Sequence, residues 1–127
     1  MRCASFPAGA AVTAGALLAC SPLQAHHSYA MFDMKKDVAL EGTVSEFQWT
    51  NPHIWIDLVA IDKGTGQSTK WSIEGSAPTS LRAMGWRQDS LKQGDQVSLV
   101  VHPLKDGSHG GTLVKILVNG RELNTKG

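Results

Sequence analysis

The chain has 127 residues, of which 42% are hydrophobic and 18% charged, and its 12 basic and 11 acidic residues give a formal net charge of +1. This length fits one domain. The composition is too apolar for a disordered chain, and the chain is too short for an α/β-barrel enzyme. The near-neutral charge disfavours nonspecific nucleic-acid binding, because such binding needs a basic surface. Two cysteines exclude a disulfide-dense scaffold.

The first 25 residues have the layout of a secretory signal peptide. Arg2 is their single charge, an uncharged and mostly apolar run follows, and Ala25 places a small residue at the cleavage position. The apolar run is shorter than the about 20 residues that a membrane-spanning helix needs. The sequence therefore predicts a periplasmic or secreted protein without a transmembrane segment.

Two cleavage sites compete. A cut after Ala25 leaves 102 residues with equal numbers of basic and acidic side chains, no cysteine and all five histidines. The alternative treats Leu17–Cys20 as a lipoprotein signal, in which acylated Cys20 anchors the protein to a membrane. The first site is favoured, because Pro22 suits a break shortly before Ala25. The predicted parts of the chain are a signal peptide (1–25), an N-terminal arm (26–37), a β-barrel domain (38–119) and a polar C-terminal tail (120–127).

Alternating apolar and polar residues predict strands in the first half of this domain. One strand begins at Val38, and Gly42 interrupts its alternation, which suggests a bend or a bulge. Phe47 and Trp49 continue it with the opposite parity, as is typical of a strand that changes face. Further strands are predicted at 53–61 and 68–74, after a turn at 50–52 and on either side of a hairpin turn at 62–66.

The second half of the domain begins with a short helix, predicted at 78–84. Pro78 suits the first turn of a helix and Gly85 its end. Strands at 96–102 and 112–118 follow, separated by a Gly-rich loop at 103–111. Three strands, a short helix and two strands are the element order of the OB-fold, a five-stranded Greek-key barrel. We therefore predict an all-β, OB-like barrel with one short helix, the alternative being another small barrel or sandwich.

Several motifs in the chain resemble those of one family. They are His26–Asp33, Leu40–Val44, Phe47–His53, Leu91–Asp95 and His102–Gly107. In these segments the chain is similar to a family of small exported bacterial proteins, catalogued as domain of unknown function 6152. The resemblance implies export and a β-rich domain with no established activity, and it supplies no catalytic residues. His109 departs from the family pattern, where a proline precedes the double glycine, and is therefore not expected in a shared site.

His26 and His27 form the sharpest candidate site. Cleavage after Ala25 would leave His26 with a free amine, which can chelate a metal ion together with its imidazole, and His27 adds another nitrogen. All-nitrogen donor sets suit Cu(II), Ni(II) or Zn(II), with copper favoured by intrinsic affinity. The alternative is a pair of histidines on an unsupported terminus that binds nothing specific.

The loops at one end of the predicted barrel carry further histidines. In OB-folds the loops after the first and fourth strands help to form the ligand site. His53 and His102 fall at these loops, with His109 in the second of them. We expect His53 and His102 to converge and to assist metal binding, with His109 as a further candidate at the same end. The alternative is that each is a hydrogen-bonded residue at the rim of the barrel.

Trp49, Asn51 and Trp55 form the competing candidate site, around the first of these loops. An exposed pair of tryptophans would stack on a saccharide or another flat ligand. The alternative is that both indoles are ordinary core or rim aromatics. This face predicts a module that binds a small ligand, a saccharide or a protein partner.

The sequence offers no support for catalysis. It lacks a Gly-x-Ser-x-Gly motif, and the Gly-rich segment at 107–111 lacks the Lys-Ser/Thr of a phosphate loop. We therefore predict a non-enzymatic binding module that takes a divalent metal such as copper or, as the alternative, a small ligand or protein. An enzyme is the third choice.

Overall fold

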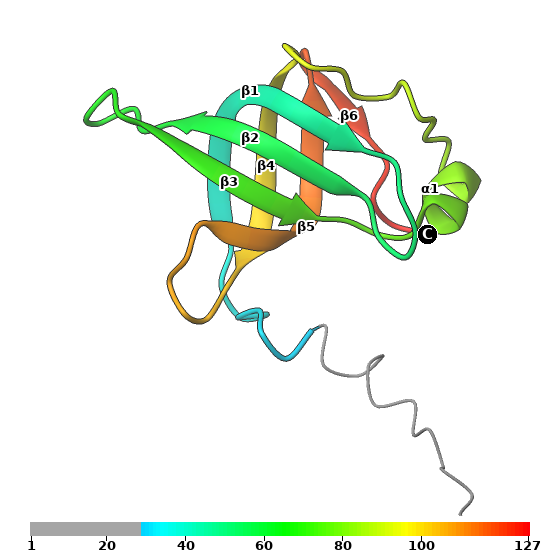
Figure 1. Cartoon of the computed structure of the whole chain (residues 1–127), viewed down its shortest axis with the longest axis horizontal. Helices are drawn as coiled ribbons and strands as arrows, with labels where there is room; N and C mark the ends of the chain where they lie inside the picture. The colour runs from blue at the N-terminus through cyan, green and yellow to red at the C-terminus, as the bar shows by residue number, and fades with distance from the viewer. Residues whose placement is uncertain (1–28) are drawn as a thin grey trace, which may run out of the picture.

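Five strands wind into a closed barrel, and a short helix lies at one end of it (Figure 1). The structure is a computed structural model and describes residues 29–127. In chain order the elements are β1 (Val38–Gln48), β2 (Trp55–Ile61), β3 (Ser68–Glu74), α1 (Pro78–Ala83), β4 (Gln96–Pro103), β5 (Gly110–Val118) and β6 (Arg121–Leu123). The strand order is β3-β2-β1-β4-β5-β6, and parallel pairing of β3 with β5 closes the barrel. The predicted all-β, OB-like barrel with one short helix is confirmed.

The long strand β1 belongs to two ladders. Its first half pairs with β4 and its second half with β2, and Gly42 takes part in both, opposite Val97 and opposite Ala60. A Cβ on Gly42 would overlap the carbonyl oxygen of Val59, so only glycine fits at this bend. A bulge between Val44 and Glu46 follows, and it accounts for the change of parity in the sequence.

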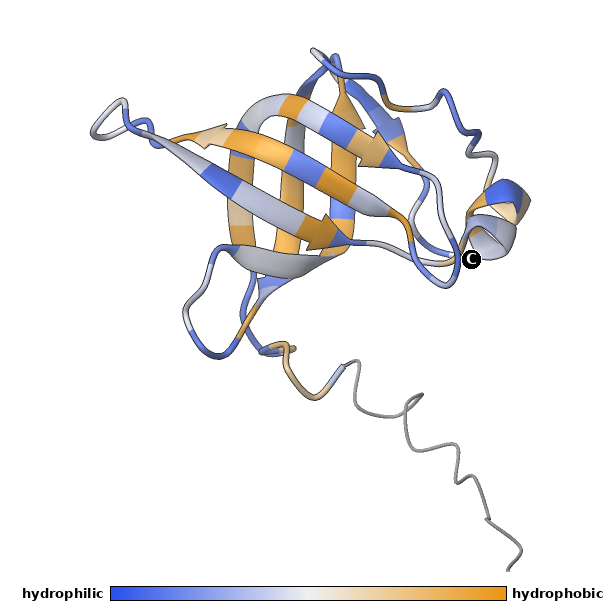
Figure 2. Ribbon diagram, viewed as in Figure 1, coloured by the Kyte–Doolittle hydropathy of each residue, from blue (hydrophilic) through white to orange (hydrophobic). Residues whose placement is uncertain are grey.

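Alternate residues of every long strand fill the barrel interior. In Figure 2, hydrophobic (orange) bands alternate with paler and blue ones along the strands. Ile54, Ile56 and Leu58 enter the core from β2 and the residue before it, and none of the three has solvent-exposed surface. Leu81 from α1 and Trp86 from the segment after it are also buried. The helix therefore belongs to the core of the barrel, and the position of the segment after it is fixed by packing.

The structure differs from the sequence prediction at both ends of β5. The strand begins at Gly110, because Gly110 and Gly111 pack closely against the backbone of the neighbouring strands. A Cβ on Gly111, for example, would lie 2.8 Å from the carbonyl oxygen of His102. Two glycines carry no alternating pattern, which is why the sequence places them in a loop. After Val118 the chain turns at Asn119 and forms β6, within the segment predicted as a polar tail.

The described part of the N-terminal arm is attached to the end of the barrel. Phe32 is buried and bridges to Leu104, and the Asp33 amide donates to the carbonyl of Pro103 at 2.8 Å. Within residues 29–127, no helix has the length and apolar character to cross a membrane. The predicted signal peptide, its cleavage site and Cys20 lie outside the described residues.

Candidate functional site

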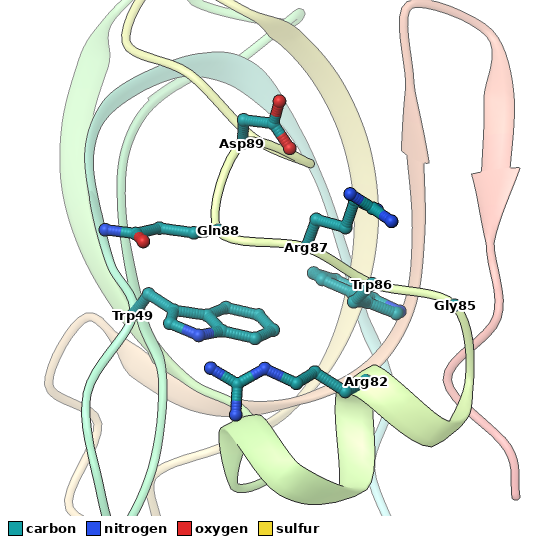
Figure 3. Close-up of a pocket in the computed structure, with 7 residues that line it drawn as sticks. All are labelled: Trp49, Arg82, Gly85, Trp86, Arg87, Gln88 and Asp89. Carbon is teal, nitrogen blue, oxygen red and sulfur yellow. The ribbon is translucent and has the colours of Figure 1, made fainter.

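A groove of about 730 Å³ lies between the end of β1 and the segment that follows α1 (Figure 3). Its lining residues are Trp49, Arg82, Gly85, Trp86, Arg87, Gln88 and Asp89. Trp49 follows directly on β1, Arg82 lies in the last turn of α1, and the others belong to the turn after it. Tryptophan and arginine, which recur in binding surfaces, thus come from two separate parts of the chain.

The indole of Trp49 forms one wall of the groove. It is half-buried, with an edge-on contact to the Phe47 ring at 6.0 Å, and the guanidinium of Arg82 lies 5.5 Å from its centroid. Among the described residues its Nε1 is the buried side-chain polar atom that lacks a hydrogen-bond partner. An unsatisfied buried donor costs about 1–3 kcal/mol. This wall of the groove therefore contains an unused donor, which a ligand can reach only when the side chains that cover it move.

Trp86 holds the opposite side of the groove in place. Its ring is 2% exposed, and its Nε1 donates to the carbonyl oxygen of Asn124 at 2.6 Å. The chain reaches Trp86 through Gly85, whose φ of +93° suits the end of a helix. Burial and the hydrogen bond to Asn124 fix the position of the Trp86 ring, and they therefore also fix the backbone of the adjacent Arg87.

The groove carries an excess of positive charge. Arg82 and Arg87 are exposed, and neither forms an ion pair with any residue between 29 and 127. Asp89 is the one acidic residue of the lining. Guanidinium groups bind carboxylate, sulfate or phosphate groups with two parallel hydrogen bonds. The groove is therefore suited to an acidic group beside a flat surface.

Of the three residues predicted to bind a ligand, only Trp49 lines this groove. Asn51 is exposed in the loop between β1 and β2, where the Asn51–Pro52 peptide is cis. Trp55 lies on the outer face of β2, opposite Glu74 of β3, and is 37% exposed. The two tryptophans thus contribute to different surfaces, because the loop between β1 and β2 separates them.

His53 is held at the end of β3. Its Nδ1 lies 3.0 Å from the carbonyl oxygen of Gly75, and its Nε2 lies 3.4 Å from Oε1 of the buried Glu74. The loop between β1 and β2 folds back so that Ile54 pairs with Gly75 through the backbone. His53 therefore has a local set of partners on β3.

His102 and His109 have other partners. Nδ1 of His102 lies 2.8 Å from the carbonyl oxygen of Lys36 and 3.1 Å from Oδ1 of Asp37, both in the N-terminal arm. The ring of His109 packs against Trp71, with centroids 5.3 Å apart. Within residues 29–127, no three His, Cys, Asp or Glu side chains lie together as a metal site would require. The structure thus does not bring the three histidines together, and His26 and His27 lie outside the described residues.

Sequence reasoning missed Arg82, Trp86 and Arg87. The signal for them was present: two arginines flank a tryptophan across the predicted end of a helix. What the sequence could not supply is that β1 delivers Trp49 to the same place. That encounter depends on the barrel, since Trp49 and Arg82 are 33 residues apart in the chain.

The comparisons with known proteins bear on family and fold. A family model described as "Family of unknown function (DUF6152)" matches residues 14–114. No curated protein matches the chain. Among solved structures, the fold is similar to that of the mitochondrial single-stranded DNA binding protein Rim1 from S. cerevisiae, with a TM-score of 0.51 and 11% identity. The match covers 68% of this chain and 95% of that one, and at this identity it shows the OB-fold alone.

Proposed function

Because the chain belongs to the DUF6152 family of unknown function, we propose its function from the groove at Trp49: an exported, non-enzymatic module that binds a small organic ligand bearing an acidic group. The observation that carries the proposal is the buried, unpartnered Nε1 of Trp49, with the Arg82 guanidinium over its ring and no ion pair for Arg82 or Arg87 among residues 29–127. A ligand that supplies hydrogen-bond acceptors to this place would satisfy the donor and pair with Arg82.

The ligand would be held by stacking and by charge. Arg82 already occupies the face of the Trp49 ring, and because its side chain is exposed it can turn toward a ligand carboxylate. A flat ring or the apolar face of a sugar would then rest against the indole. Aromatic carboxylates and uronic-acid saccharides combine such a surface with an acidic group, and they are the proposed ligand classes.

Calorimetric titration with benzoate and with uncharged benzamide tests this function. The full chain should bind benzoate at least tenfold more tightly than benzamide, since the difference is the interaction of the carboxylate with the Arg82 guanidinium. Arg82→Gln should abolish this preference. Arg121→Gln is the matched control, because Arg121 is an exposed arginine of β6 outside the groove, and it should leave the preference unchanged. Equal binding of the two probes, or equal effects of the two variants, would contradict the proposal.

The fold alone raises the question of nucleic acid, since the structural neighbour is named as a single-stranded DNA binding protein. Binding of single strands relies on a basic groove with several stacking aromatics. Here the balance of charge is near zero, and one half-buried indole faces the groove. We therefore propose no nucleic-acid function, and the chain should fail to retard a labelled oligothymidylate at physiological salt.

Metal binding is the second candidate function, and the environment of His102 favours it. With Nδ1 directed at the carbonyl oxygen of Lys36 and at Asp37, Nε2 is the ring nitrogen left to face a ligand. A backbone carbonyl or carboxylate on the other nitrogen is the usual support of a metal-binding imidazole. We propose that His26 and His27 of the processed chain supply the principal ligands for copper, with His102 or His53 assisting.

Intact mass and metal analysis of the exported protein tests this second candidate. Cleavage after Ala25 and bound copper are the expected results, and His26→Ala should weaken copper binding at least tenfold. Acylation of Cys20, or micromolar or weaker affinity that His26→Ala leaves unchanged, would contradict it.

A further inference from the structure

A second cavity lies in the barrel wall, where two strands have separated from their neighbours. β3 pairs with β5 only over Ser72–Glu74, so that its first half has no partner on that side. The first residues of β1 extend past the end of its ladder with β2, which begins at Gly42. Between these two unpaired stretches the structure contains a cavity of about 570 Å³. This volume is within the range of small-molecule sites, about 300–1,000 Å³.

The floor of this cavity is apolar. Val38 and Leu40 of β1 and Trp71 of β3 are partly buried against the core, and Ala60 of β2 is 6% exposed. Trp71 lies opposite Leu58, on the side of β3 that faces the barrel interior. The ring of His109, from the exposed loop between β4 and β5, covers part of Trp71. The cavity is therefore an outward continuation of the hydrophobic core, with an aromatic wall.

The charged residues at the rim of the cavity are Glu41, Asp62 and Lys63. Nζ of Lys63 lies 2.7 Å from Oε2 of Glu41, across the space between the hairpin and β1. Asp62 accepts hydrogen bonds at 2.8 Å from the amides of Gly64 and Thr65. Lys63 is paired with Glu41 and Asp62 is bonded only to uncharged amides, so the rim keeps an excess of one negative charge, which repels anions. The apolar floor offers no partner to a charged group of either sign.

We propose that this cavity binds a small, uncharged, flat aromatic molecule that stacks on Trp71 beneath His109. The apolar floor supplies the driving force and disfavours charged groups, the indole supplies a stacking surface, and the acidic excess at the rim repels anions. His109 lies on a loop and can move aside to admit the ligand. The site is independent of the groove at Trp49, which attracts acidic groups and lies beside α1.

Titration of the full chain with N-phenyl-1-naphthylamine, an uncharged flat fluorophore, tests the proposal. Saturable binding with energy transfer from tryptophan is expected. Trp71→Leu should weaken binding at least tenfold, whereas Trp55→Leu, a matched change on the outer face of the neighbouring strand, should leave the affinity unchanged. Linear, unsaturable fluorescence, or equal losses in the two variants, would overturn it.

Two more variants keep the test decisive if Trp71→Leu does not fold. Thr69→Trp places a large ring in the cavity from a half-buried position of its lining and should block the fluorophore. Arg82→Gln should have no effect, because Arg82 lines the other groove. Undiminished binding in folded Thr69→Trp would overturn the proposal. Loss of fluorophore binding in Arg82→Gln would also overturn it, by showing that the probe occupies the groove at Trp49.

Discussion

Two tryptophans of this chain differ in how their indole N–H groups are satisfied. Nε1 of Trp86 donates to the carbonyl of Asn124 from a ring that is almost fully buried, whereas Nε1 of Trp49 is buried without a partner. The indole of Trp86 therefore stabilises the fold. The indole of Trp49 retains an unused donor in the wall of a groove, which is the feature that sets it apart as a binding residue.

Because of this difference, we expect replacement by phenylalanine to lower the free energy of unfolding by different amounts at the two positions. Trp86→Phe should lower the free energy of unfolding by about 2–3 kcal/mol, because it removes a hydrogen bond and leaves a cavity. Trp49→Phe should lower it by about 1 kcal/mol or less, since it also removes an unsatisfied donor. Urea denaturation of the two variants checks this. A larger loss in Trp49→Phe would show that its N–H is satisfied.

Asp62 organises the turn between β2 and β3 through its carboxylate. The amide hydrogen bonds from Thr65 and Gly64 lower the pKa of Asp62 below its ordinary value of 3.8. A lowered pKa in the folded state means that the stabilisation is present above pH 3.8 and is lost as the pH falls through the folded value. The amide resonances of Gly64 and Thr65 should therefore shift as the pH is lowered below 3.8, and Asp62→Asn should abolish this titration. Amide shifts that persist in Asp62→Asn would contradict the assignment.

At the scale of elements, the bend of β1 determines where the functional groups lie. The same strand pairs with β4 and then with β2, and the bulge after Val44 turns its last residues toward α1. This path brings Trp49 to Arg82 at one end. It also leaves Val38 and Leu40 unpaired with β2 beside the second cavity.

Gly42 is the residue on which this bend depends. Gly42→Ala should destabilise the fold by about 3 kcal/mol, because the new methyl group would collide with the backbone of β2 at Val59. Gly64→Ala is the control: it adds the same methyl group in the exposed hairpin turn, near only a side-chain oxygen of Asp62. Its cost should stay within about 0.5 kcal/mol. Equal losses in urea denaturation would contradict the role given to the bend.

At the scale of the whole molecule, the sequence predicts the barrel because its strands alternate clearly and its helix has a proline at the start and a glycine after its end. It does not predict β6, which has three residues, or the start of β5, where Gly110 and Gly111 have no side chains to alternate. The predicted site is recovered in part. Trp49 is identified by its place in a loop, but its neighbours Arg82 and Arg87 meet it only through closure of the barrel.

The histidines illustrate the same limit. His53 and His102 occupy the loops that an OB-fold uses for ligands, yet each is bound to backbone carbonyls of a different neighbour, Gly75 for one and Lys36 for the other. Position along the chain specifies the end of the barrel. Which residue a side chain contacts depends on the path by which each loop folds back onto the barrel. That path is set by tertiary packing and cannot be read from the local sequence.

The groove at Trp49 is the central claim, and the indole N–H resonance of Trp49 tests it most directly. Assigned by comparison with Trp49→Phe, this resonance should shift downfield saturably when benzoate is added, as an unpartnered donor acquires an acceptor. Benzamide should produce a shift only at concentrations at least tenfold higher. The resonance of Trp86, already bonded to Asn124, should move little with either probe. A Trp49 resonance that stays unchanged at saturating benzoate, or that follows benzamide equally, would contradict the account.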